Sequence, residues 1–389
     1  MTMSGLDRLL GSDTELSRLR ERPFALLCHP ASVTRHHVHI YDALGAAGLR
    51  PAVLFGPEHG LGGEAQDMDA VGDARNADGV RVRSLYGAEF ADLTPKDEDL
   101  HGLGTLVIDL QDVGSRYYTF VWTAVLASRR ALSLGVDVLV LDRANPLGTA
   151  LIEGRVQEPG FLSFVGLEPI PVRHALTLGE IVAWQVAKLD TRRAELRVLA
   201  HTGSEHEAMW VYPSPNMPTR NTALVYPGGC LLEGSNLSDG RGMTRPFEIT
   251  GAPWVDGHAL SAKLHAVGLP GVAFRPMRFQ PTFHKHAGKN CGGLQVHVTD
   301  KAAFRPVATY AALITAAHHL WPEQFVFRTE RYEYVDHIPA FDLLTGSARA
   351  REMILAGAAP AAVAEYVSET DASLSLQARS TALQHASWA

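Results

Sequence analysis

The sequence predicts an α/β protein in two parts, a doubly wound and mostly parallel sheet followed by a smaller α+β domain. The first half alternates short apolar runs with amphipathic stretches, and runs such as VDVLVLD (136–142) are apolar at nearly every position. Continuous apolar runs are typical of parallel strands covered by helices on both faces. The pattern changes after about residue 200, and 389 residues exceed what one hydrophobic core usually organises.

The first half follows a strand and helix order that can be justified element by element. Strands are expected at residues 23–29, 51–57, 105–112, 136–142 and 194–201, and helices at 36–48, 118–134 and 177–189. Thr177 and Glu180 have the spacing of a capping box at the start of the last helix. Strands that alternate with helices form βαβ units, which predicts a parallel sheet.

The second half is dominated by Gly and Pro. Residues 212–254 show little helical or strand periodicity, and loops of this length inside a compact domain are more often functional than not. Residues 271–300 and a helical pattern at 306–321 indicate the smaller α+β domain. We therefore predict two domains, residues 1–205 and residues 206–389.

Composition excludes several classes of partner. The net charge is −7 and the basic residues are scattered, so no nucleic acid partner is expected. Cys28, Cys230 and Cys291 are widely spaced without a CxxC pair, which favours reduced thiols over disulfides or a zinc ribbon. The N-terminus shows no signal-peptide pattern and no long apolar run occurs, so we expect a cytoplasmic protein without a membrane partner. The oligomeric state stays open.

Polar residues follow four of the expected strands. Ligands of doubly wound sheets bind beyond the carboxyl ends of the strands, so these residues are expected to meet at one edge. They are His29, then Glu58 and His59, then Asp109, Gln111 and Asp112, and finally Asp142, Arg143 and Asn145.

The stretch LFGPEHGLGGEAQD (54–67) allows three functional interpretations. It lacks the Lys-Ser/Thr of a P-loop and the spacing of a dinucleotide-binding loop. Adjacent residues such as Glu58 and His59 seldom reach one metal ion, and no HExxH occurs. The third interpretation is a carboxylate on a tight turn, formed by Pro57 and Gly60, that acts as a general acid. Alternatively, Glu58 caps the next helix or pairs with Arg75.

Other residue types in the loops favour sugar chemistry. Glycoside hydrolysis needs an acid and either a second carboxylate or a neighbouring group of the substrate. Loop arginines suit the capture of carboxylates, although each could form an internal salt bridge, and aromatic faces with amides are typical of sugar sites. The chain also lacks G-x-S-x-G and any cysteine with evident His and Asn partners. The further candidates are the carboxylates Asp112, Glu153, Glu233 and Asp239, the arginines Arg116, Arg143, Arg241 and Arg245, the amides Asn216, Asn221 and Asn236, and the aromatics Tyr118, Trp122, Trp210 and Trp254.

Seven motifs, in order along the chain, resemble those of the NamZ-type exo-β-N-acetylmuramidases. They lie at residues 55–67, 84–87, 108–120, 141–148, 213–219, 226–254 and 283–293, within a similarity that spans about residues 23–347. The resemblance implies a Rossmann-like N-terminal domain, a smaller C-terminal domain and an active site in the cleft between them. It also implies release of N-acetylmuramic acid from the non-reducing end of peptidoglycan fragments. We expect no metal, nucleotide or other cofactor.

The resemblance also implies roles for individual residues. Glu58, in GPEHG, is expected to be the general acid, with His59 and Asp109 in support. The second catalytic group is Glu153 or Glu233, or else the 2-acetamido group of the substrate. The expected substrate-binding residues are Gln111, Arg116, Tyr118, Arg143, Asn145, Asn216, Asn236, Arg241 and Arg245, together with His284, Lys285 and Lys289 in a possible anion clamp.

The sequence departs from the family at two points, and two rival functions are considered. Family members are often exported, whereas no signal is visible here, and Ala144 stands where a proline is expected. One rival function is a peptidoglycan-fragment-binding protein without turnover. The other is a metal-dependent hydrolase that uses Asp109 and Asp112.

Overall fold

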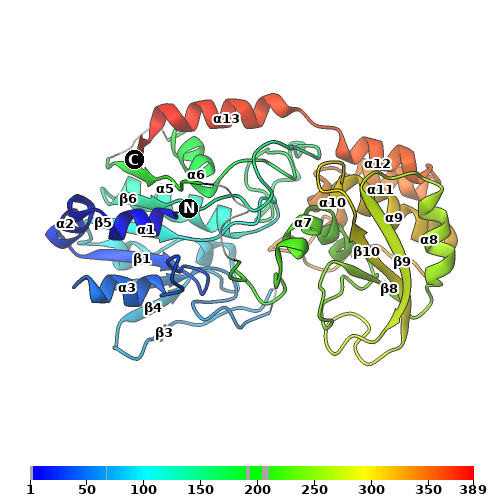
Figure 1. The fold of residues 1–389 in the computed structure, drawn as a ribbon, viewed down its shortest axis with the longest axis horizontal. Coiled ribbons are helices and arrows are strands. Elements are labelled where there is room, and N and C mark those ends of the chain that lie inside the picture. The colour runs from blue at the N-terminus through cyan, green and yellow to red at the C-terminus, as the bar shows by residue number, and fades with distance from the viewer. Residues whose placement is uncertain (1–2, 67, 190–192, 204–209) are drawn as a thin grey trace.

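The first domain is built on an eight-stranded sheet with the strand order β11-β7-β6-β5-β1-β2-β4-β3. The computed structural model describes residues 3–66, 68–189, 193–203 and 210–389 (Figure 1). All neighbouring strands pair in parallel except β3 and β4. The strands are β1 (Phe24–Cys28), β2 (Val53–Gly56), β3 (Ala74–Arg75), β4 (Arg81–Ser84), β5 (Thr105–Asp109), β6 (Asp137–Leu141), β7 (Leu196–Leu199) and β11 (Ser387–Trp388).

Helices cover both faces of this sheet, which confirms the doubly wound prediction. Alternate side chains of β1 point to opposite faces, so that Leu26 packs in the core beneath α1 to α3 and Leu27 in the core beneath α5 and α6. The predicted capping box is present, because Thr177 accepts from the Glu180 amide and Glu180 accepts from the Thr177 amide. The helices are α1 (Gly5–Leu10), α2 (Asp13–Glu21), α3 (Ile40–Ala46), η1 (Phe90–Leu93), α4 (Asp97–Leu100), α5 (Phe120–Ser133) and α6 (Leu178–Val186).

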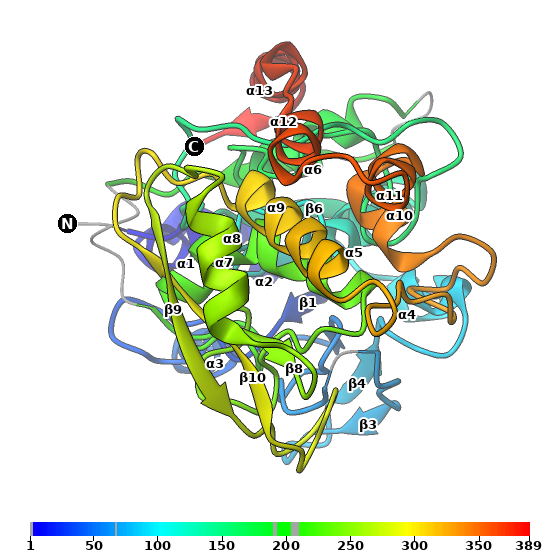
Figure 2. The same ribbon diagram turned by 90° about the vertical axis from the view of Figure 1, so that its right-hand side faces the viewer.

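The second domain contains a three-stranded antiparallel sheet in the order β8-β10-β9, flanked by helices (Figures 1 and 2). Its strands are β8 (Ile249–Ala252), β9 (Val272–Phe279) and β10 (Cys291–Val298). Its helices are α7 (Arg220–Gly229), η2 (Cys230–Gly234), α8 (Gly257–His265), α9 (Pro306–Leu320), α10 (Ala340–Thr345), α11 (Arg349–Leu355) and α12 (Pro360–Ser368). Helix α9 is buried from Pro306 to Ala317 and forms the centre of this domain.

The chain then returns to the first domain. Helix α13 (Ala372–His385) crosses from the second domain to the first along the top of Figure 1. Beyond it, β11 pairs in parallel with β7, with Ser387 opposite Arg197 and Trp388 opposite Val198. The division of the chain at residue 205 stays a prediction, and the return adds a second connection between the two parts. Within the described residues, no helix is both long and apolar enough to cross a bilayer.

Candidate active site

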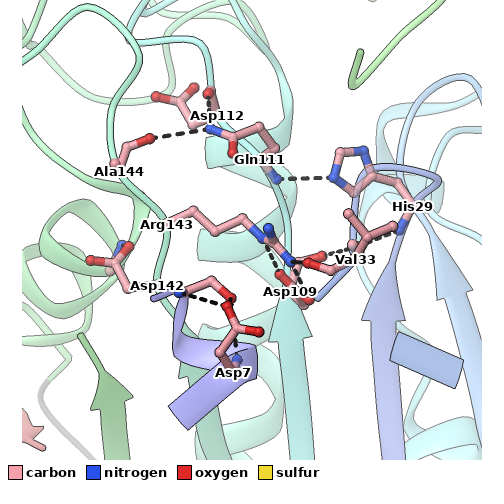
Figure 3. Close-up of polar contacts among 12 residues, drawn as sticks. Asp7, His29, Val33, Asp109, Gln111, Asp112, Asp142, Arg143 and Ala144 are labelled. Carbon is pink, nitrogen blue, oxygen red and sulfur yellow. Dashed lines mark hydrogen bonds and ion pairs between the residues drawn. The ribbon is translucent and has the colours of Figure 1, made fainter. Parts of the chain in front are cut away.

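The polar residues that follow β5 and β6 form a buried ion pair. Arg143 donates from Nε to Asp109 Oδ1 at 2.5 Å and from Nη2 to Asp109 Oδ2 at 2.9 Å (Figure 3). The same guanidinium donates to the carbonyl oxygen of Val33 at 2.9 Å. Asp109 is fully buried, so the pair is a fixed internal contact that joins the ends of three neighbouring strands.

His29, which follows β1, completes this edge. Its Nε2 accepts from the backbone amide of Gln111 at 3.0 Å, and its Nδ1 lies 3.2 Å from the carbonyl oxygen of Pro213. Burial lowers the pKa of His29 to about 3, so the ring is neutral and Nδ1 carries the proton. The Gln111 side chain donates to the carbonyl oxygens of Asp112 and Ala144 (Figure 3). The edge between β1 and β5 is therefore filled by the protein's own groups.

A pocket lies where the two domains meet, lined by residues of both. The first half of the chain contributes Glu58, His59, Tyr117, Tyr118, Thr119 and Val165, and the second half contributes Ser214, Asn216, Met217, Tyr226, Glu233, Arg241, Phe247, Tyr332 and Glu333. Carboxylates, one guanidinium, one amide and several aromatic rings thus face one space among the described residues, which is the composition of a sugar-binding site.

Glu58 is held in this pocket by a tight turn after β2. The amide of Gly60 donates to the carbonyl oxygen of Pro57 at 2.9 Å, and His59 and Gly60 both have left-handed φ values of 70° and 80°. The turn buries the Glu58 side chain, which accepts from the Thr119 hydroxyl at 2.6 Å and from the backbone amide of Met68 at 3.4 Å.

The two alternative roles of Glu58 receive no support from these contacts. Arg75 donates instead to the carbonyl oxygen of Gly79 at 2.6 Å. His59 is fixed by a contact of 2.8 Å between its Nδ1 and the carbonyl oxygen of Ala65. Glu58 and His59 of the GPEHG motif therefore both line the pocket, and contacts with other parts of the protein hold their side chains in place.

Residues of the second domain form a buried ionic cluster. Arg241 contacts Glu233 at 2.8 Å and Asp239 at 3.1 Å, and Lys285 Nζ lies 3.4 Å from Asp239. Burial alone would raise the pKa of Asp239, but Arg241 and Lys285 hold it well below its usual range. The second oxygen of Glu233 accepts from the Tyr332 hydroxyl at 2.7 Å. Glu233 and Asp239 thus both bind one guanidinium.

Several predicted substrate-binding residues lie outside this pocket. Arg116 is fully buried and donates to three backbone carbonyl oxygens at 2.7 to 2.8 Å. The side chains of Asn145 and Asn236 also bind backbone groups, and Arg245 pairs with Glu248 at 3.2 Å. These side chains therefore bind other groups of the protein. Tyr118, Asn216 and Arg241, by contrast, line the pocket.

The FHKHAGK segment (283–289) contacts the ionic cluster through Asp239. His284 Nδ1 lies 3.5 Å from Asp239, and Lys285 also donates to the carbonyl oxygen of Leu232 at 2.9 Å. Lys289 is exposed on the same loop. Two of the three donors of the expected anion clamp therefore serve an internal carboxylate.

Glu153 lies at the contact between the two domains and outside the pocket. Its carboxyl group accepts from the backbone amide of Ala308 at 3.0 Å, at the start of α9. Burial raises the pKa of Glu153 to about 7, partly opposed by the Ala308 amide and by Arg173. A neutral carboxyl group can occupy this position at acidic pH, whereas its ionised form is costly to bury.

Nine of the described residues that line the pocket were not predicted from the sequence: Tyr117, Thr119, Val165, Ser214, Met217, Tyr226, Phe247, Tyr332 and Glu333. Tyr86, which donates to Glu333, was not predicted either. Thr119 lies inside the IDLQDVGSRYYTF motif, so the motif was a usable signal for it. Tyr332 and Glu333 lie in RYEYVDH, which has neither glycine nor proline and gave no sign of a turn. In the described part of the chain, no three His, Cys, Asp or Glu side chains are grouped to hold a metal ion.

The fold and the site define a family. The chain belongs to the exo-β-N-acetylmuramidase NamZ family, whose N-terminal model matches residues 24–221 and whose C-terminal model matches residues 224–376. The two matches together span most of the chain and include the GPEHG turn and the ionic cluster.

Individual relatives agree with this assignment. The chain is 40% identical over 333 residues to the peptidoglycan β-N-acetylmuramidase NamZ of Bacillus subtilis (strain 168), which covers 83% of this chain and 79% of that protein. Two crystal structures of DUF1343 family proteins from Bacteroides fragilis NCTC 9343 have the same fold. Their TM-scores are 0.82 and 0.74 and their identities 27% and 25%, with 100% of this chain and 99% of each of theirs covered.

Replacement of Glu153 by glutamine should change how stability depends on pH. An ordinary glutamate loses its proton near pH 4.5, whereas folded Glu153 keeps it to about pH 7. Between these values the folded chain binds more protons than the unfolded chain, so the contribution of Glu153 to the free energy of unfolding falls as pH rises. Relative to wild type, Glu153→Gln should gain up to ~3 kcal/mol between pH 5 and pH 8. Urea unfolding at both pH values measures this gain, and parallel pH profiles would contradict it.

Replacement of Arg241 by methionine should destabilise the protein strongly. Two buried carboxylates, Glu233 and Asp239, would lose their shared cation, and a broken buried ion pair costs ~3–5 kcal/mol. Arg331→Met is the matched control, because Arg331 and its partner Asp336 are 3.7 Å apart and largely exposed, where a pair contributes about 0–1 kcal/mol. Urea unfolding compares the two, and equal effects would show that the cluster is not structural.

Proposed function

We propose that this protein is an exo-acting glycoside hydrolase that releases N-acetylmuramic acid from the non-reducing end of peptidoglycan fragments, with Glu58 as the general acid. The position of Glu58 carries the proposal, because the glutamate of GPEHG is buried in a pocket formed by both domains. The Bacillus subtilis relative is a peptidoglycan β-N-acetylmuramidase, which agrees with this substrate class.

Glu58 acts on the glycosidic oxygen. As the bond between C1 and that oxygen breaks, the carboxyl group of Glu58 transfers its proton to the leaving sugar. A water molecule then forms the new bond to C1, and the proton that it releases returns to the Glu58 carboxylate. The Thr119 hydroxyl, 2.6 Å away, fixes the orientation of the carboxyl group, and Thr119 in turn precedes α5. A general acid must point at one oxygen of a bound sugar, so this orientation is part of the reaction.

Three other pocket residues suit the sugar itself. N-acetylmuramic acid carries a lactyl carboxylate, and Arg241 is the guanidinium among the described residues that line the pocket. We assign Arg241 to this carboxylate, with Glu233 and Asp239 holding the guanidinium in place. Asn216 contributes an amide for the polar groups of the sugar, and Tyr118 contributes an aromatic face.

The remaining sequence candidates receive other roles. Asp109 and Arg143 neutralise one another outside the pocket, and an ion bound by Asp109 would have to displace the guanidinium. Arg116, Asn145 and Asn236 position the backbone through their carbonyl and amide contacts. The cytoplasmic location stays a prediction.

Replacement of Glu58 by glutamine should abolish most of the hydrolysis while sparing binding. Glutamine keeps the shape of the side chain but cannot donate the proton, so we expect a loss of ~10²–10⁴-fold in kcat. The measurement is release of free N-acetylmuramic acid from a peptidoglycan disaccharide, with EDTA present. Glu64→Gln, on an exposed residue of the same loop, should match wild type.

Each outcome of this measurement decides between functions. Turnover by wild type and loss in Glu58→Gln support the general acid. Binding of the disaccharide without turnover by wild type would favour a fragment-binding protein. Turnover that EDTA abolishes would favour a metal-dependent hydrolase.

A further inference from the structure

A strained turn of the second domain points into the pocket. The amide of Tyr332 donates to the carbonyl oxygen of Val335 at 2.9 Å, and the amide of Val335 donates to the carbonyl oxygen of Tyr332 at 3.0 Å. The two central residues, Glu333 and Tyr334, have left-handed φ values of 46° and 68°. Tight turns with positive φ at both centres normally contain Asn and Gly. A glutamate and a tyrosine in this conformation are strained, and such strain is concentrated at functional sites.

Three consecutive side chains of this turn contact three parts of the site. The Tyr332 hydroxyl donates to Glu233 at 2.7 Å, within the second domain. Glu333 accepts from the hydroxyl of Tyr86 at 3.2 Å, and the Tyr334 hydroxyl donates to the carbonyl oxygen of Gly87 at 3.0 Å. Tyr86 and Gly87 follow β4 of the first domain, so the turn joins both domains beside the pocket.

We propose that Glu333 is the second carboxylate of the reaction, which contacts the sugar held against Glu58, and that Tyr86 is its positioning residue. This inference rests on the proposed function. The Glu333 side chain is buried and lines the same pocket as Glu58. Burial, Glu58 and Glu333 together raise the pKa of Tyr86. Tyr86 is therefore a neutral phenol that donates its hydrogen bond to Glu333.

The role of Glu333 follows from the charge that develops on the sugar. When the bond to the leaving oxygen breaks, positive charge appears on C1 and on the ring oxygen. The carboxylate of Glu333, in the same pocket as the proton donor, stabilises that charge, and no bond forms between Glu333 and the sugar.

Glu333→Gln tests the charge without changing the shape. Glutamine still accepts from Tyr86, so a purely structural role would leave kcat near wild type. We expect kcat to fall by ~10²–10³-fold with little change in KM, as when one electrostatic contact to a transition state is removed. Glu330→Gln is the matched control, because Glu330 lies on the same loop with a side chain that is 76% exposed.

Two chromogenic β-glycosides of N-acetylmuramic acid separate the two acids. One has a strongly acidic phenol as leaving group and the other a weakly acidic phenol. Glu58→Gln should lose far less activity on the first, because an acidic phenol leaves without a proton. Glu333→Gln should lose about the same on both, because positive charge develops on the sugar in either case.

The outcomes distinguish this inference from the proposed function. No turnover of any substrate by folded wild type would overturn the proposed function. Active wild type with Glu333→Gln within about 3-fold of it would overturn the inference alone, as would a loss that follows the leaving group. If Glu333→Gln fails to fold, Tyr86→Phe replaces it, with an expected loss in kcat of about 10-fold on both glycosides and an unchanged kcat as the contrary result.

Discussion

The ion pair between Asp109 and Arg143 is the contact on which the arrangement of the site depends. Doubly wound sheets have a crevice where neighbouring strands send their connections to opposite faces, here between β1 and β5, and ligands commonly bind there. In this protein the crevice is filled by Asp109, Arg143 and the neutral ring of His29. The pocket that we propose as the ligand site lies beyond β2, where the second domain completes it, and the contact between His29 and Pro213 joins the connecting segment to this edge.

Much of this fold follows from side-chain patterns. Buried parallel strands such as β6 are apolar at nearly every position and were predicted, whereas β4 was missed because RVRS is polar and only one of its residues is fully buried. The sequence also placed Glu58 on a turn after a strand. It could not separate Arg241, which lines the pocket, from Arg116, which binds backbone carbonyls. Both lie in Gly-containing loops, and only the tertiary fold decides which group each guanidinium meets.

The site combines two kinds of support. The first domain holds Glu58 with a hydroxyl and a backbone amide, which orient the carboxyl group. The second domain holds Glu233 and Asp239 with the cations Arg241 and Lys285 and the phenol of Tyr332. Glu333 was missed because its turn contains none of the residues that are typical of turns. The strain of this turn is seen only in the backbone φ angles. Functional positions are where local sequence preference and structure are expected to disagree.

The return of the chain through α13 to β11 has a consequence for biosynthesis. Strand β7 gains its neighbour β11 only after residues 387–388 have left the ribosome. By then the second domain has already been synthesised. Until then the edge of β7 and the face of α6 that α13 covers stay open to other chains. The second domain is therefore synthesised before the sheet of the first domain is complete. An early stop before α13 would damage the first domain and leave the helices of the second domain intact.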